Sequence, residues 1–134
     1  MENPNLLSPS VLCFVGDSVY SLLVRTKLAE INRPSAQLHK LSVELVKASA
    51  QAKALELILP LLTPNELSIF KSGRNFHTSS SPKNATKGEY HTATGLECLF
   101  GYLYLLGEDI RIKELFGNIW QDFKNSMEAS QNET

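Results

Sequence analysis

The sequence has 134 residues, of which 43% are hydrophobic and 20% charged, and its formal net charge is −1. This composition is ordinary for one globular domain, and the charge gives no overall indication of a nucleic-acid partner. No apolar run is long enough to span a bilayer and no signal peptide is recognisable, so we expect a cytoplasmic protein. Cys13 and Cys98 lie in apolar segments, as small buried residues do in a reducing compartment, and no spaced Cys/His set indicates zinc.

Helix-starting and helix-ending signals predict an all-α bundle with five main helices. Ser8 with Pro9, and the capping box at 63–66, are typical helix starts, whereas Pro34 and Pro60 end the helices before them. The prediction is one domain over residues 9–126, with helices at 9–31, 35–59, 64–75, 90–106 and 108–126, a loose N-terminus at 1–8 and a frayed C-terminus at 127–134.

The predicted helix at 35–59 carries a seam of small and apolar side chains. They alternate in steps of three and four residues, which is helical spacing. The seam consists of Leu38, Leu41, Leu45, Ala48, Ala52, Leu55 and Leu59. Such a seam is typical either of a dimer face or of an internal core, and both interpretations stay open.

Two apolar segments each contain one acidic residue. Asp17 interrupts the run at 11–24, and Glu97 the run at 93–106, and at helical spacing both share a face with apolar neighbours. Each acid needs a cap, a basic partner or a cation, because an unpaired buried carboxylate is costly. If the two helices cross, the pair makes a hard oxygen site suited to Mg²⁺. Gly95 and Gly101 in the second segment predict close contact with another helix.

A long polar loop is expected at 73–89. Four basic residues and no acidic ones lie between positions 71 and 87, namely Lys71, Arg74, Lys83 and Lys87. Positive charge gathered on one loop allows contact with phosphates, although composition alone favours a solvated connection.

The segment FVGDSVY at 14–20 resembles the signature helix of the ribonuclease III family, which centres on a Gly-Asp pair. LECLFGYLYL at 96–105 resembles that family's second catalytic helix. The chain looks most like the subgroup Mini-ribonuclease III, which consists of the catalytic domain alone. The subgroup's motifs occur in its order over roughly residues 9–120: LHKLS at 38–42, SAQA at 49–52, GRN at 73–75, PKN at 82–84 and YHTATGLECLFGYLYLLG at 90–107.

The resemblance implies an all-helical homodimer that holds double-stranded RNA in a shared valley. It also implies Mg²⁺-dependent hydrolysis of one phosphodiester on each strand, leaving 5′-phosphate and 3′-hydroxyl ends. The subgroup is associated with the maturation of ribosomal RNA precursors (23S) in bacteria and plastids, where a ribosomal protein on the substrate is a further expected partner. We expect no membrane partner.

The resemblance also assigns roles to individual residues. Asp17 and Glu97 carry over as catalytic residues and metal ligands. Arg74, Asn75, Lys83 and Asn84 match the subgroup's loop and are expected RNA contacts, and Lys87 is added to them as a basic residue of the same loop. Cys13 and Thr94 stand where the larger enzymes carry further acids, as in the smaller subgroup, which leaves the number of metal ions open.

Two other functions remain as alternatives. The same fold would serve as a non-catalytic RNA-binding or ribosome-assembly module, although such a module would have little reason to keep both acids. A helical adaptor that binds a protein through the seam at 35–59 is the third hypothesis, and the concentrated basic loop disfavours it.

Overall fold

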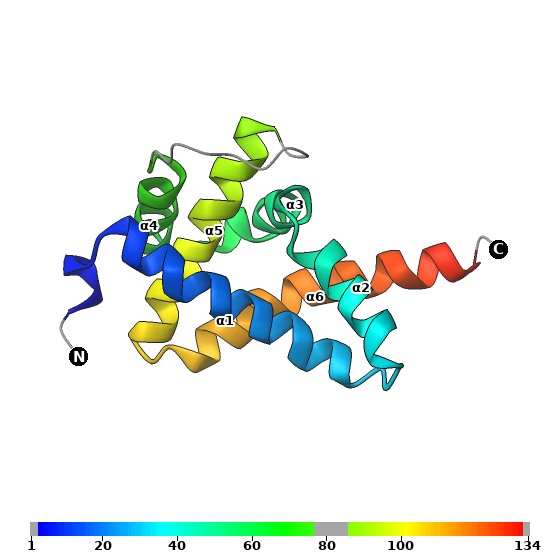
Figure 1. Cartoon of the computed structure of the whole chain (residues 1–134). Helices are drawn as coiled ribbons and strands as arrows, with labels where there is room; N and C mark the ends of the chain where they lie inside the picture. Colours follow the sequence, from blue (N-terminus) through cyan, green and yellow to red (C-terminus); the bar gives the residue numbers. More distant parts are fainter. Residues whose placement is uncertain (1–2, 77–85, 133–134) are drawn as a thin grey trace.

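The computed structural model describes residues 3–76 and 86–132, which form an all-α fold without a strand in those ranges (Figure 1). This confirms the predicted fold class. Two short 3-10 turns, η1 and η2, accompany six helices. The elements are η1 (Pro4–Leu6), α1 (Pro9–Ala29), α2 (Ser35–Val46), α3 (Ala48–Ile58), η2 (Leu59–Leu61), α4 (Pro64–Arg74), α5 (Lys87–Leu105) and α6 (Asp109–Asn132).

Helix α5 is the central helix, and α1, α3 and α4 pack around it (Figure 1). Its residues 93–103 are small or apolar and, apart from Glu97, all are buried. Tyr20 of α1 lies edge-on to Phe100 of α5 and Phe116 of α6, with ring centroids 5.5 and 5.7 Å apart. One aromatic cluster therefore joins three helices, and it stabilises them beyond the apolar area that it buries.

Glycines fix how closely α5 approaches its neighbours. A Cβ atom at Gly16 of α1 would collide with the carbonyl oxygen of Glu97, and one at Gly101 would collide with the carbonyl oxygen of Leu12. At the other crossing, a Cβ atom at Gly95 would lie 2.6 Å from the ring of Phe70 in α4. The close contacts predicted for Gly95 and Gly101 are confirmed, and α1 meets α5 backbone to backbone.

The single helix expected at 35–59 is wrong, because the chain breaks at Lys47. This residue is extended, with φ −64° and ψ 156°, and separates α2 from α3. The buried amide of Gln51 donates a 2.8 Å hydrogen bond to the carbonyl of Val46, a carbonyl that the break leaves without its helical partner. The break lets α3 turn toward α5 while α2 packs on α1.

The seam at 35–59 belongs to the core. Leu55 is buried, and Leu38, Leu41 and Leu45 are partly buried against the hydrophobic core. Only Leu59, in η2, is clearly exposed. The internal-core interpretation is therefore confirmed for most of the seam, and it leaves no continuous apolar face for a dimer or an adaptor contact.

The last two helices are longer than predicted. α5 begins at Lys87, because Thr86 and Glu89 form a capping box in which each side chain bonds the other's backbone N–H, at 3.0 and 3.2 Å. α6 continues to Asn132, where fraying was expected from Met127. None of the helices within 3–76 and 86–132 has the length and apolarity that a membrane crossing requires.

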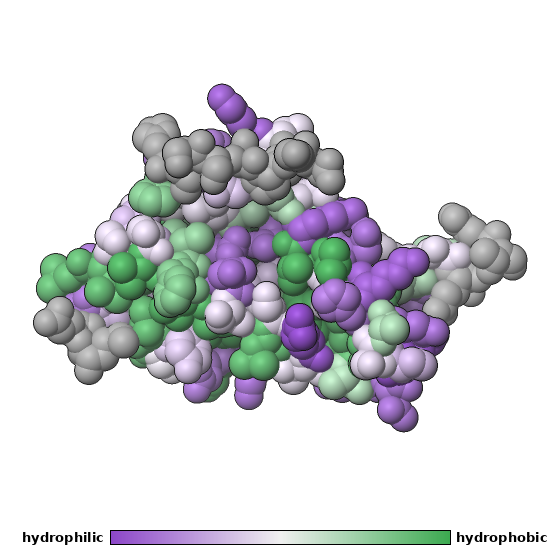
Figure 2. All heavy atoms as spheres, viewed as in Figure 1, coloured by the Kyte–Doolittle hydropathy of each residue, from purple (hydrophilic) through white to green (hydrophobic). Residues whose placement is uncertain are grey.

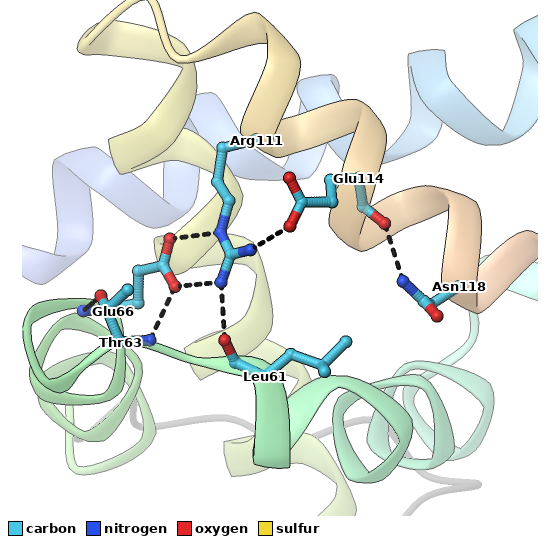
Figure 3. A network of polar contacts seen from close by, with 6 residues as sticks. All are labelled: Leu61, Thr63, Glu66, Arg111, Glu114 and Asn118. Atoms are coloured by element: carbon cyan, nitrogen blue, oxygen red, sulfur yellow. Dashed lines mark hydrogen bonds and ion pairs between the residues drawn. The ribbon is translucent and has the colours of Figure 1, made fainter.

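A buried ion pair connects α4 to α6 (Figure 3). The guanidinium of Arg111 donates two hydrogen bonds to the carboxylate of Glu66, at 2.9 and 2.8 Å, and a third to the carbonyl of Leu61 at 2.7 Å. Glu66 also accepts from the backbone N–H of Thr63, the cap of α4. Hydrogen bonding to Arg111 holds the pKa of Glu66 below its ordinary value. The pair thus fixes the start of α4, the helix whose other end carries Arg74.

Candidate active site

Asp17 and Glu97 meet where α1 crosses α5. Glu97 is half-buried, and its carboxyl group lies within hydrogen-bonding reach of that of Asp17. Burial, followed by the nearby acidic groups of Cys13 and Asp17, raises the pKa of Glu97 to about 9. The geometry follows from the sequence, because Gly16 precedes Asp17 and packs on the carbonyl of Glu97.

Asp17 is exposed, which corrects the prediction of two acids on buried apolar faces. The neighbours of Asp17 at helical spacing differ in exposure. Tyr20 and Val24 are 1% and 0% exposed, whereas Phe14 is 80% exposed. Asp17 therefore sits at the border between core and solvent. Its carboxylate keeps most of its hydration and faces outward, as contact with a large substrate requires.

The donor set suits a hard cation. Two carboxyl groups this close repel each other when both are ionised, and a cation between them removes that repulsion. No group of three or more His, Cys, Asp or Glu side chains that could hold a metal occurs within the residues that the structure describes. A divalent cation held by these two carboxyl groups would complete its coordination with water or with substrate oxygens.

The positions of Cys13 and Thr94 add no further ligand. Thr94 is buried, and its hydroxyl donates to the carbonyl of Tyr90 at 3.0 Å. Cys13 lies against Cys98, whose thiol donates to the carbonyl of Pro9 at 3.1 Å, and both thiols are free. Hydrogen bonding to Cys13 and burial raise the pKa of Cys98. These groups pack the helix crossing beside the carboxylates.

Two of the five predicted RNA contacts lie near the carboxylate pair. A Cβ atom at Gly73 would lie 2.7 Å from the side chain of Cys98, the residue after Glu97, so the end of α4 lies close to Glu97. Arg74 and Asn75 follow directly. The Arg74 guanidinium lies 5.5 Å from the centre of the Phe70 ring, and its Nε donates to the Asn75 side chain at 3.3 Å.

The other three predicted contacts are further away or not described. Lys87 is exposed in the first turn of α5, ten residues before Glu97, which corresponds to about 15 Å along the helix. Lys83 and Asn84 lie outside the described residues, so their roles stay predictions.

One exposed basic side chain on α1 was missed by the sequence reasoning. Ser21 and Arg25 follow Asp17 on α1 at spacings of four and eight, so they continue its face, and Arg25 is exposed. Arg25 and His39 line a hollow of about 580 Å³ between α1 and α2. The sequence does contain a signal for Arg25, because Asp17, Ser21 and Arg25 follow one another at intervals of four residues.

Comparison with known proteins shows the family to which the chain belongs. The family profile described as Ribonuclease III domain matches residues 10–108. A Mini-ribonuclease 3 from Thermoanaerobacter sp. (strain X514) is 48% identical over 110 residues, covering 81% of this chain and 78% of the relative. A Mini-ribonuclease 3 from Brevibacillus brevis is 45% identical over 116 residues, covering 85% and 86%.

A crystal structure of a protein from Fusobacterium nucleatum has a similar fold. Its TM-score is 0.77 at 28% sequence identity, and the match covers 82% of this chain and 90% of that one. The matched profile includes both Asp17 and Glu97. The Ribonuclease III domain profile matches most of the chain, and the two relatives above are both named Mini-ribonuclease 3. The chain therefore belongs to the ribonuclease III family.

Proposed function

We propose that the chain is an endoribonuclease that hydrolyses phosphodiesters in double-stranded RNA, with Mg²⁺ held by Asp17 and Glu97. The observation that carries the proposal is the meeting of these two carboxyl groups at the α1–α5 crossing, within a ribonuclease III domain. The family acts on double-stranded RNA with a divalent metal. That the metal is Mg²⁺ is our proposal, supported by the all-oxygen donor pair.

The residues have separable roles in hydrolysis. When bound, Mg²⁺ neutralises charge on the scissile phosphate and lowers the barrier to attack by water. Glu97, anchored on the buried helix α5, fixes one side of the ion site, and exposed Asp17 closes it from α1. Arg74 and Asn75 at the end of α4 donate hydrogen bonds to phosphate oxygens near the cut. No covalent nucleophile is needed, and the products carry 5′-phosphates.

Basic side chains on three helices are the expected contacts for the phosphates of the RNA duplex. Arg25, Arg74 and Lys87 lie on α1, α4 and α5, and none forms an ion pair with a described carboxylate. Lys83 and Asn84 extend this set on the resemblance alone. Contacts of this type recognise the phosphate backbone and shape of A-form RNA, so we expect weak sequence preference.

We infer that two copies of the chain form a homodimer through the start of α1. Phe14 is 80% exposed and Val11 43% exposed, and Leu6 of η1 is 78% exposed. Figure 2 shows hydrophobic side chains gathered over η1 and this part of α1. Phe14 lies one turn before Asp17, so a symmetric contact there brings two carboxylate pairs together, one for each RNA strand.

The identity of the natural RNA substrate is a further part of the proposal. Precursor ribosomal RNA, a ribosomal protein bound to it and a cytoplasmic location are supported by the resemblance to the subgroup. A non-catalytic RNA-binding module is the second candidate function, and the presence of both carboxyl groups in one site disfavours it.

Metal dependence separates these two functions. A labelled RNA duplex is incubated with the native chain in Mg²⁺ and in EDTA, with a single strand of the same sequence as the control. We expect cleavage of the duplex in Mg²⁺ only. Duplex that is bound in Mg²⁺ but never cut would overturn the enzymatic function and leave the binding module.

A further inference from the structure

A second hollow lies at the other end of α1 from the catalytic crossing. It has a volume of about 710 Å³ and lies between the C-terminal end of α1, helix α2 and the C-terminal half of α6. In Figure 1, α2 and this part of α6 occupy the same end of the molecule. Its nearest lining residue on α1 is Lys27, ten residues beyond Asp17, or about 15 Å along the helix. The hollow is thus separate from the carboxylate site.

An aromatic side chain forms part of the wall. Trp120, the only tryptophan of the chain, is half-buried there, beside the partly buried side chains of Ile31, Leu41 and Met127. No described aromatic ring stacks on Trp120. Trp120 packs in part against the hydrophobic core, and the rest of its side chain lines the hollow, where a flat apolar group would contact it.

The rim is basic. Lys27, Arg33, Lys40 and Lys124 come from α1, the α1–α2 connection, α2 and α6, so they surround the indole from several sides. Lys27 lies 4.0 Å from Glu30, whereas Arg33, Lys40 and Lys124 form no ion pair with any carboxylate in the part of the chain that the structure describes. Three cations remain for an anionic ligand.

We propose that this hollow binds an unpaired nucleotide, with its base on the indole of Trp120 and its phosphate held by Arg33, Lys40 and Lys124. Aromatic stacking beside a cationic rim is the pattern that holds single-stranded nucleotides, because every base has a flat face and every phosphate a charge. Glu30 and Glu128 also line the hollow; their carboxylates can accept hydrogen bonds from the amino group of a base, whereas the phosphate must lie on the side of the cations. A free nucleotide and the single-stranded end of an RNA offer the same chemistry.

The single tryptophan makes binding directly measurable. AMP, a pentaadenylate strand and a blunt RNA duplex are titrated separately into the Asp17→Asn chain, which removes the proposed cleavage, while tryptophan fluorescence is followed. We expect saturable quenching with both AMP and the pentaadenylate, with tighter binding of the strand if RNA ends are the source, and no quenching with the blunt duplex. Because catalysis is not measured, the outcome is independent of the proposed nuclease activity.

Variants assign the signal to the hollow. Lys124→Glu reverses an exposed charge on the rim, and we expect it to weaken binding of the pentaadenylate by about tenfold. Lys113→Glu is the matched control, since it reverses an exposed charge of the same helix outside the hollow. The proposal is overturned if neither AMP nor the strand quenches the fluorescence, if the blunt duplex quenches it as strongly as the strand, or if Lys113→Glu weakens binding as much as Lys124→Glu.

Discussion

Gly16 is the residue that brings the two carboxyl groups together. A Cβ atom at this position would collide with the carbonyl oxygen of Glu97 in a backbone that cannot move aside cheaply. We expect Gly16→Ala to lower the free energy of unfolding by about 1–3 kcal/mol and to weaken Mg²⁺ binding, because α1 must shift away from α5.

Gly117 supplies the matched control for Gly16. It lies within α6, and nothing comes within 4 Å of the Cβ atom that alanine would add. Gly117→Ala should therefore raise the free energy of unfolding by about 0.5–1 kcal/mol. Equal stability of the two alanine variants in urea titrations would contradict the backbone contact between α1 and α5.

Glu66 makes the stability of the protein depend on pH. Because Arg111 lowers its pKa, the ion pair stabilises the fold fully above the ordinary glutamate pKa of about 4.3, and this is lost as pH falls through the lowered pKa. Arg111→Leu should cost about 3 kcal/mol at pH 7, with the difference from the native chain shrinking in acid.

Urea titrations from pH 7 down to pH 3 measure this dependence. Lys113→Leu, which replaces an exposed cation of the same helix without an ion pair in the described structure, should show a small difference that does not change with pH. A constant cost of Arg111→Leu across the range would mean that the charge of Glu66 is not what Arg111 stabilises.

At this scale the sequence predicted that the helices of Asp17 and Glu97 cross, but not how exposed the two side chains are. A lone carboxylate in an apolar helical run is an unusual feature, so Asp17 and Glu97 were found. Helical spacing gives a face only to within about a third of a turn, and Asp17 lies at the edge of its face, between buried Tyr20 and exposed Phe14. The ion pair of Glu66 with Arg111 joins residues 45 apart, which spacing cannot reveal.

At the scale of the helices, the N-terminal cap of α5 holds the first turn of that helix, which carries Lys87. Thr86 accepts a hydrogen bond from the N–H of Glu89 at 3.0 Å. We expect Thr86→Ala to cost about 1 kcal/mol and to increase amide exchange at 87–90, while the residues around Glu97 keep their protection. Thr63→Ala removes the corresponding cap of α4, so its exchange should rise at 64–67 instead. Faster exchange throughout α5 in Thr86→Ala would show that the cap stabilises the whole helix.

Local patterns predicted most helices and missed three boundaries, namely the start of α5, the break at Lys47 and the end of α6. The capping box at Thr86 has the same signal as the one recognised at Thr63, but it lay inside a segment whose polar composition was typical of a loop. The break at Lys47 has no such signal, because no Gly, Pro or capping box marks it. It exists because α3 packs on α5, which is a tertiary effect.

For the molecule as a whole, the exposed apolar residues at the start of α1 predict self-association. Phe14→Ser should convert a dimer into a monomer, because it removes a side chain whose burial contributes roughly 2 kcal/mol in each copy. Ile110→Ser is the matched control, since Ile110 is 83% exposed at the start of α6. Sedimentation over a range of concentrations measures both. A monomeric native chain, or a dimer lost only in Ile110→Ser, would contradict this face.

The central claim is that Asp17 and Glu97 form one metal-dependent catalytic site. The most direct measurement compares cleavage of a labelled RNA duplex in Mg²⁺ by Asp17→Asn, Glu97→Gln and Glu56→Gln, the last an exposed carboxylate on α3. Each of the first two should lose roughly a hundredfold or more in rate while still binding the duplex, and Glu56→Gln should cut like the native chain. Native rates in a folded Asp17→Asn or Glu97→Gln chain would contradict the account.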